Sequence, residues 1–196
     1  MGDDIAAAGS SDGRVASRWL RAVALSWGFA EATLFFVVPD VWISHAAVRS
    51  LRQGLWASVF ALAGALAGGV VVYLLGLRHQ TALLALYDHL PAISRDLIVR
   101  VSDQLQSLGG LGMVLGGFTG TPYKLYAAQA ASAGMDLAPF LAASVLARGL
   151  RFVLVALAVS LIARVLQARL GTRATQRILV VFWIVFYGWY WSRMPN

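Results

Sequence analysis

The chain has 196 residues, of which 59% are apolar and only 13% are charged, and its mean hydropathy is +0.71. Soluble globular chains contain roughly 45–50% apolar and ~25% charged residues, so this composition excludes an ordinary soluble domain and predicts an integral membrane protein. Cysteine is absent, which excludes disulfides and thiolate metal sites. The formal net charge of +7 does not indicate nucleic-acid binding, because the basic residues flank or interrupt apolar segments instead of forming one run.

The first segment, residues 1–17, is polar and begins with acidic residues (MGDDIAAAGSSDGR), unlike a cleaved signal peptide. It is predicted to be a short disordered tail. The remainder, 18–196, is predicted to be a single membrane domain.

Three apolar stretches are predicted to cross the membrane. Residues 54–77 carry no charge, and these 24 residues are long enough for a hydrocarbon core of ~30 Å. Residues 137–163 are also long enough, although Arg148 and Arg151 lie near their middle. Residues 178–192 form a shorter, very aromatic third span that could use Arg193 as an anchor.

Two further stretches are unlike simple spans. Residues 22–48 contain Glu31 and are interrupted at Pro39, and residues 108–135 are broken by glycines and by Pro122. Broken backbone at membrane depth persists only where protein or a wet cavity satisfies its polar groups, so both are predicted to be re-entrant hairpins. Between them, residues 79–105 have apolar residues at helical spacing and are predicted to form interfacial helices.

The arginines support this layout and give it an orientation. With the hairpins returning to the side they enter from, one side would carry nine arginines: Arg14, Arg18, Arg21, Arg49, Arg52, Arg164, Arg169, Arg173 and Arg177. The other side would carry four: Arg78, Arg95, Arg100 and Arg193. The richer side, which includes the N-terminus, is predicted to be cytoplasmic.

The layout of hairpin followed by span occurs twice. Pro39 aligns with Pro122 at a shift of 83 residues, and this shift can be held without gaps over residues 39–76 and 122–159. The two hairpins would then enter from opposite faces. Inverted repeats whose broken segments meet near the midplane are a recurring transporter design, with the site at their meeting point.

Ionisable residues within apolar segments are functional candidates, because each costs roughly 2.5–3.5 kcal/mol at a helix centre on insertion scales. They are Glu31, Asp40, Lys124, Arg148 and Arg151. The cations would hold an anionic headgroup, most simply a phosphate. The carboxylates would neutralise the empty site and could take up a proton.

A structural alternative stays open for these charges. Arg148 and Arg151 could pair internally and only hold the hairpins together. Asp40 could be no more than a turn or cap residue after Pro39. Glu31 and Lys124 favour function, because each lies in a broken segment.

Other polar and aromatic residues favour structural roles. Thr119 and Thr121 are expected to cap freed backbone groups rather than contact a substrate, and Tyr73 is expected to pack. One aromatic group is expected to form an interface belt: Trp183, Tyr187, Trp189, Tyr190 and Trp191. The histidines His45, His79 and His89 lack ligand spacing, so no metal site or cofactor is predicted, and no enzyme signature is found.

Two segments resemble signatures of a known family. FAEATLFFVVPDVWI (29–43) resembles the first signature of the DedA/VTT membrane proteins, the SNARE-associated Golgi protein superfamily. GFTGTPYKLYAAQAASAGMDLAPFLAASVLARGLRF (117–152) resembles the second, in the form F-T-x-x-P-[YF]-K, A-G, P-F and R-G-x-R-F of the YqaA-like bacterial branch. The resemblance covers residues 27–164.

The resemblance implies two opposed re-entrant hairpins and a role in moving phospholipids or carrier-lipid phosphates, with proton dependence in some members. Glu31 and Asp40 fall on its acidic positions, Arg148 and Arg151 on R-G-x-R, and Lys124 where many members carry arginine. Lysine keeps that charge but loses bidentate phosphate geometry. Its structural motif positions are Pro39, Thr119, Pro122 and Gly134.

The sequence therefore predicts an all-α integral membrane protein of the bacterial inner membrane, with re-entrant hairpins and spans in an inverted repeat. The expected function is transport of lipids, with membrane lipids and protons as partners. Homo-oligomerisation stays open. The alternatives are a proton-coupled transporter of a small solute, and a non-transporting membrane scaffold for the cell envelope.

Overall fold

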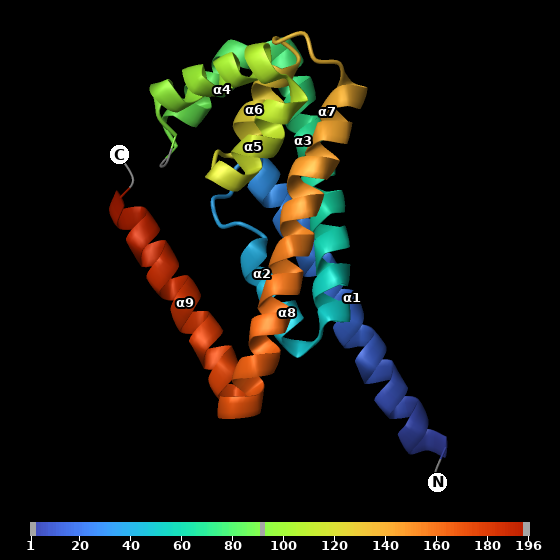
Figure 1. The fold of residues 1–196 in the computed structure, drawn as a ribbon. Coiled ribbons are helices and arrows are strands. Elements are labelled where there is room, and N and C mark those ends of the chain that lie inside the picture. Colours follow the sequence, from blue (N-terminus) through green and yellow to red (C-terminus); the bar gives the residue numbers. More distant parts are fainter. Residues whose placement is uncertain (1–2, 91–92, 194–196) are drawn as a thin grey trace.

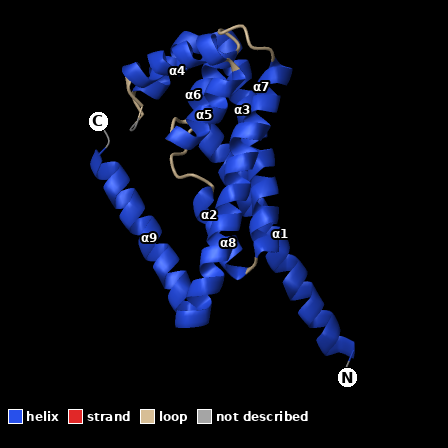
Figure 2. Cartoon of the chain, viewed as in Figure 1, coloured by secondary structure: helices blue, strands red, loops and turns tan. Residues whose placement is uncertain are grey.

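The computed structural model describes residues 3–90 and 93–193, and the side chains from residue 18 onwards within these ranges. The described residues are helical with short connections and contain no strand (Figure 2). The helices are α1 (Asp3–Thr33), α2 (Asp40–Arg49), α3 (Leu51–Asp88), α4 (Arg95–Leu108), α5 (Gly110–Thr119), α6 (Tyr123–Ala130), α7 (Leu137–Ser144), α8 (Leu150–Leu170) and α9 (Thr172–Arg193). A π-helical turn, Val145–Gly149, joins α7 to α8 without a break.

Two helices are long and apolar enough to cross a membrane: α3, and the continuous helix Leu137–Leu170. They contain the first two predicted spans. The third predicted span lies in α9, which is not one of these two, because polar and basic residues precede its short apolar run. Large apolar side chains are nevertheless exposed on all three helices, as at Leu77, Leu161 and Ile184. Contiguous exposed apolar surface is rare on soluble monomers and supports a membrane protein.

Helices α1 and α3 pack closely through glycines. A side chain at Gly64 would meet the carbonyl of Leu25, and one at Gly68 would meet the carbonyl of Phe29. From one pair to the next, the residue numbers increase along both helices, so α1 and α3 run parallel, as Figure 1 shows. Small residues that let helix backbones approach are typical of membrane helix pairs.

The chain breaks where the sequence predicts. Helix α1 ends at Thr33 and α2 begins directly after Pro39, and α5 ends at Thr119 and α6 begins directly after Pro122. Both breaks lie part-way along the long helices in Figure 1, and α2 then leads back to the end where α3 begins. Each predicted hairpin is therefore a helix–break–helix arrangement.

Two boundaries differ from the prediction and one agrees with it. Residues 3–17, expected to be disordered, belong to α1, in keeping with the high helix propensity of the alanine run 6–8. Within α3, non-helical angles at His79 (φ −137°, ψ 37°) separate two helices by a kink, where the first interfacial helix was predicted to begin. Residues 137–163 extend to Leu170, where Gly171 (φ +79°) ends the helix. Pro91, which interrupts the predicted interfacial helices 79–105, lies outside the described residues.

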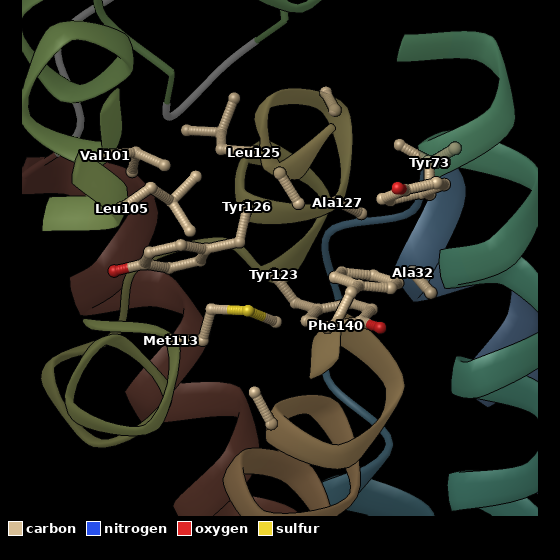
Figure 3. Packing of buried hydrophobic residues seen from close by; sticks show 14 of the residues in the cluster. Ala32, Tyr73, Val101, Leu105, Met113, Tyr123, Leu125, Tyr126, Ala127 and Phe140 are labelled. Atoms are coloured by element: carbon tan, nitrogen blue, oxygen red, sulfur yellow. The ribbon is translucent and has the colours of Figure 1, made fainter. Parts of the chain in front are cut away.

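An aromatic core holds α6 among its neighbours (Figure 3). Phe140 of α7 stacks between Tyr73 of α3 and Tyr123 of α6, at centroid distances of 5.2 and 6.1 Å. The Tyr73 hydroxyl donates to the Met135 carbonyl at 2.9 Å, so Tyr73 packs as expected. All eight residues of α6 are buried. Lys124 is therefore presented by a helix that is enclosed by protein.

Candidate functional site

The first ion pair joins the end of α1 to the π-helical turn. Nη1 of Arg148 donates to Oε1 of Glu31 at 3.2 Å, and Nη2 donates to Oε2. Glu31 is 5% exposed and Arg148 is 8% exposed, so both charges are buried. The guanidinium also lies over the rings of Tyr123 and Phe152, 4.8 and 5.1 Å from their centroids. The fork geometry of a bidentate pair fixes both side chains.

The second ion pair joins α2 to α8. Nε of Arg151 donates to Oδ2 of Asp40 at 3.0 Å and Nη2 donates to the same oxygen, while Nη1 donates to the Gly117 carbonyl at 3.1 Å. Asp40 occupies the first turn of α2, where the helix dipole favours a carboxylate. No side chain caps that helix end, and the Asp40 carboxylate instead accepts from Arg151, which argues against the open alternative of Asp40 as only a cap.

Lys124 is 1% exposed, yet no carboxylate of the described residues lies within ion-pair distance of it. Its Nζ donates to the Phe35 carbonyl at 2.8 Å and lies 4.4 Å from the centroid of the Phe36 ring. An ammonium group has three donors. The Phe35 carbonyl is the one acceptor found for Lys124 among the described residues, which leaves donors available to a ligand.

The same side chains satisfy the backbone groups that the breaks release. Lys124 binds the carbonyl of Phe35 in the first break, and Arg151 binds that of Gly117 beside the second. Nε1 of Trp27 donates to the Val37 carbonyl at 2.8 Å. At the second break the Thr121 amide and the Thr119 hydroxyl donate to the Gly116 carbonyl, at 3.0 and 3.4 Å. Thr119 therefore has the backbone role expected of it.

These residues border an open pocket with a cavity volume of about 180 Å³. Its charged lining residues are Glu31, Lys124, Arg148 and Arg151, and Asp40 is bound to Arg151 but is not part of the lining. Thr121 and Pro122 also line it. Most of the remaining lining is aromatic or apolar: Phe35, Phe36, Val38, Met113, Tyr123, Tyr126, Phe182, Trp183, Phe186, Tyr187 and Tyr190. The five predicted site residues are thus brought together.

The position of α9 beside the pocket was not predicted from the sequence. Trp183, Tyr187 and Tyr190 line the pocket, whereas Trp189 and Trp191 are exposed. The aromatic residues that were expected to form one interface belt therefore divide into two groups. The first three recur at intervals of four and three residues, which places them on one helix face. This periodicity could have distinguished these three residues from Trp189 and Trp191 in the sequence.

The remaining motif residues shape the backbone. Gly134 has a φ of +78°, a left-handed conformation that favours glycine, and Pro39 and Pro122 precede α2 and α6. Within residues 3–90 and 93–193, no group of three or more metal-binding side chains was found.

Comparisons of the chain with protein-family models, with curated proteins and with solved structures found no match. The resemblance to the DedA/VTT signatures therefore stays a hypothesis.

Proposed function

We propose that this protein is a lipid transporter of the bacterial inner membrane, which moves phospholipids or lipid-linked phosphates by binding the phosphate between its two breaks. The observation that carries the proposal is Lys124, a buried ammonium in the pocket with no carboxylate partner among the described residues. A buried charge needs a partner. An anionic ligand in the pocket would provide one.

The charge balance of the site supports an anion. Two carboxylates and two guanidiniums neutralise each other in the pairs of Glu31 with Arg148 and Asp40 with Arg151. Lys124 then leaves the site with one net positive charge. A phosphodiester carries one negative charge, so a phospholipid headgroup would neutralise the site.

The lining supports a lipid over a small hydrophilic solute. A hydrated solute would be expected to meet mainly polar groups in its binding site, but here the few charged residues stand among a lining that is mostly aromatic or apolar. The lining includes aromatic side chains such as Phe36, Phe186 and Tyr190. A ligand with a charged group and an apolar body fits this composition.

The chain order supports an inverted repeat with re-entrant hairpins. Helices α2 and α6 begin at Asp40 and Tyr123, which are related by the same shift of 83 residues as Pro39 and Pro122. A long helix follows each of them, α3 in one half and α7 to α8 in the other, and these run in opposite directions in Figure 1. In this proposal the breaks meet at the membrane midplane, and the N-terminus is cytoplasmic.

Proton coupling would act through the carboxylates. Protonation of Glu31 or Asp40 would remove one partner of a buried ion pair and release an arginine towards the headgroup. Substrate movement would then follow the proton gradient.

One observation favours the scaffold alternative. Both arginine pairs are complete, and Lys124 and Arg151 bind backbone of the breaks, so these charges could serve only to hold the helices together. Under that alternative, variants that keep the fold keep full function in cells.

The test is translocation by purified protein in liposomes, with labelled phosphatidylglycerol or a polyprenyl phosphate, with and without an imposed pH gradient. Translocation by the wild type that fails in Glu31→Gln and Lys124→Ala would support the proposal. The exposed Arg169→Ala variant is the control for loss of a surface charge. Absence of translocation of either lipid under both conditions would contradict it.

A further inference from the structure

Helix α9 has two unlike faces. Its inner face presents Phe182, Trp183, Phe186, Tyr187 and Tyr190 to the pocket. Its outer face is aliphatic and exposed: Val181 is 57% exposed, Ile184 66% and Val185 63%. A single helix therefore separates this side of the pocket from the surroundings of the protein.

The attachment of α9 to the rest of the chain is limited. It follows α8 through Gly171, whose φ is +79°, and in Figure 1 it runs along the side of the bundle as its outermost helix. Two hydrogen bonds join its aromatic face to the first break and to α2. The Val38 amide donates to the Tyr187 hydroxyl at 2.9 Å, and Nε1 of Trp183 donates to the Ser44 hydroxyl at 2.9 Å.

Charged and aromatic side chains line the same pocket. Lys124 and Arg148 line it together with Phe186 and Tyr190. Nε of Arg148 is buried and has no hydrogen-bond partner among the described residues, and Lys124 has donors to spare. A ligand that satisfies these donors must offer acceptor oxygens, one that also balances the charge of Lys124 is anionic, and the aromatic lining favours an apolar portion.

We infer that the inner face of α9 is a binding subsite for one hydrocarbon chain of an amphiphile whose anionic headgroup contacts Lys124. The inference rests on the proposed function, since it takes a lipid as the ligand. The chain lies along Phe186 and Tyr190, and the headgroup lies between the breaks. Because one helix wall separates the subsite from the surrounding lipid, the chain enters beside α9 without crossing the core.

Photocross-linking tests this subsite directly. Phe186 is replaced by a diazirine-bearing phenylalanine in the full-length chain, which is placed in phosphatidylcholine nanodiscs with a trace of phosphatidylglycerol. Mass spectrometry gives the ratio of phosphatidylglycerol to phosphatidylcholine adducts. A net positive site should enrich the anionic lipid at position 186 about tenfold over the bilayer ratio, corresponding to ~1.4 kcal/mol. The same replacement at Ile184, on the outer face, should give the bilayer ratio.

Two comparisons link the chain to the headgroup site. With Lys124→Met, the enrichment at position 186 should fall to the bilayer ratio, and position 184 should not change. A diacylglycerol with the same chains but no phosphate should show no enrichment at position 186 when Lys124 is in place. This comparison tests the headgroup without a substitution at the headgroup site.

The bilayer ratio at position 186 with Lys124 intact would overturn the inference, and so would adducts only to neighbouring side chains, which would mean that protein fills the space. Translocation without enrichment would overturn the subsite and leave the transport proposal intact. Enrichment without translocation would support the subsite and contradict transport.

Discussion

Glu31 and Arg148 are 117 residues apart in the chain and form a buried, bidentate ion pair. Arg148 lies in a five-residue π-helical turn. This turn interrupts the regular α-helical geometry between α7 and α8. π-Helical turns are rare in proteins overall, but those that occur are often found at functional sites. The pair therefore joins the end of α1 to the point where the second long helix departs from regular geometry.

Removing one member of this pair should destabilise the protein more than removing both. Glu31→Leu and Arg148→Met each leave a buried charge without its partner, at a cost of about 3–5 kcal/mol, whereas the double variant should be close to wild type. Thermal unfolding in detergent, treated as a double-mutant cycle, measures this. Additive losses would contradict a direct pairing. Wild-type transport by a stable double variant would show that the pair is only structural.

Arg151→Lys should loosen the second break. Arg151 contacts Asp40 and the Gly117 carbonyl together through its planar fork, and a lysine ammonium cannot reproduce that fork. A lost hydrogen bond to buried backbone costs about 1–3 kcal/mol, so the melting temperature should fall. Arg169→Lys, at an exposed position, is the matched control and should leave it unchanged. Equal melting temperatures for both variants would contradict the role given to Arg151.

Lys124→Met should separate stability from binding. Among the described residues the buried ammonium has no carboxylate partner that the substitution would leave unpaired. The lost hydrogen bond to Phe35 should be offset by the removal of the ammonium's desolvation cost. The free energy of unfolding should therefore change by less than about 1 kcal/mol. The affinity for short-chain phosphatidylglycerol in neutral detergent should fall about tenfold. Arg169→Met controls for general charge. Unchanged affinity would remove Lys124 from the headgroup site.

Gly64→Ala should force α1 away from α3. A Cβ atom at Gly64 would lie 2.8 Å from the carbonyl carbon of Leu25, which is backbone and cannot rotate away. Overpacking of this kind costs about 1–3 kcal/mol. Gly188→Ala is the control, because no atom lies within 4 Å of the corresponding position, and it should be neutral or slightly stabilising. A neutral Gly64→Ala would contradict the close packing of these helices.

The sequence predicted the two breaks and marked the charged residues that the structure brings together, because both follow from strong local rules. Proline and glycine interrupt apolar runs at Pro39 and Pro122, and charge within such runs is costly enough to mark Glu31 and Lys124 as candidates. It did not predict which cation stays without a carboxylate. That depends on distances between segments far apart in the chain, such as Glu31 and Arg148.

The features missed by the sequence analysis depend on tertiary packing. The aromatic run of α9 has the composition of an interface belt, and only the position of the helix beside the first break assigns Tyr187 to the pocket. The π-helical turn at Val145–Gly149 has no sequence signature of its own. The end of the first predicted span near residue 77, by contrast, agrees with the kink at His79 that divides α3 into two helices.

The central claim is that Lys124 binds the headgroup of a lipid that the protein moves. The most direct measurement is the initial rate of phosphatidylglycerol translocation in liposomes, compared between the wild type and Lys124→Met at equal amounts of folded protein. Translocation is expected for the wild type, and a rate at the protein-free background is expected for Lys124→Met. Equal rates for the two proteins, or a wild-type rate at background, would contradict it.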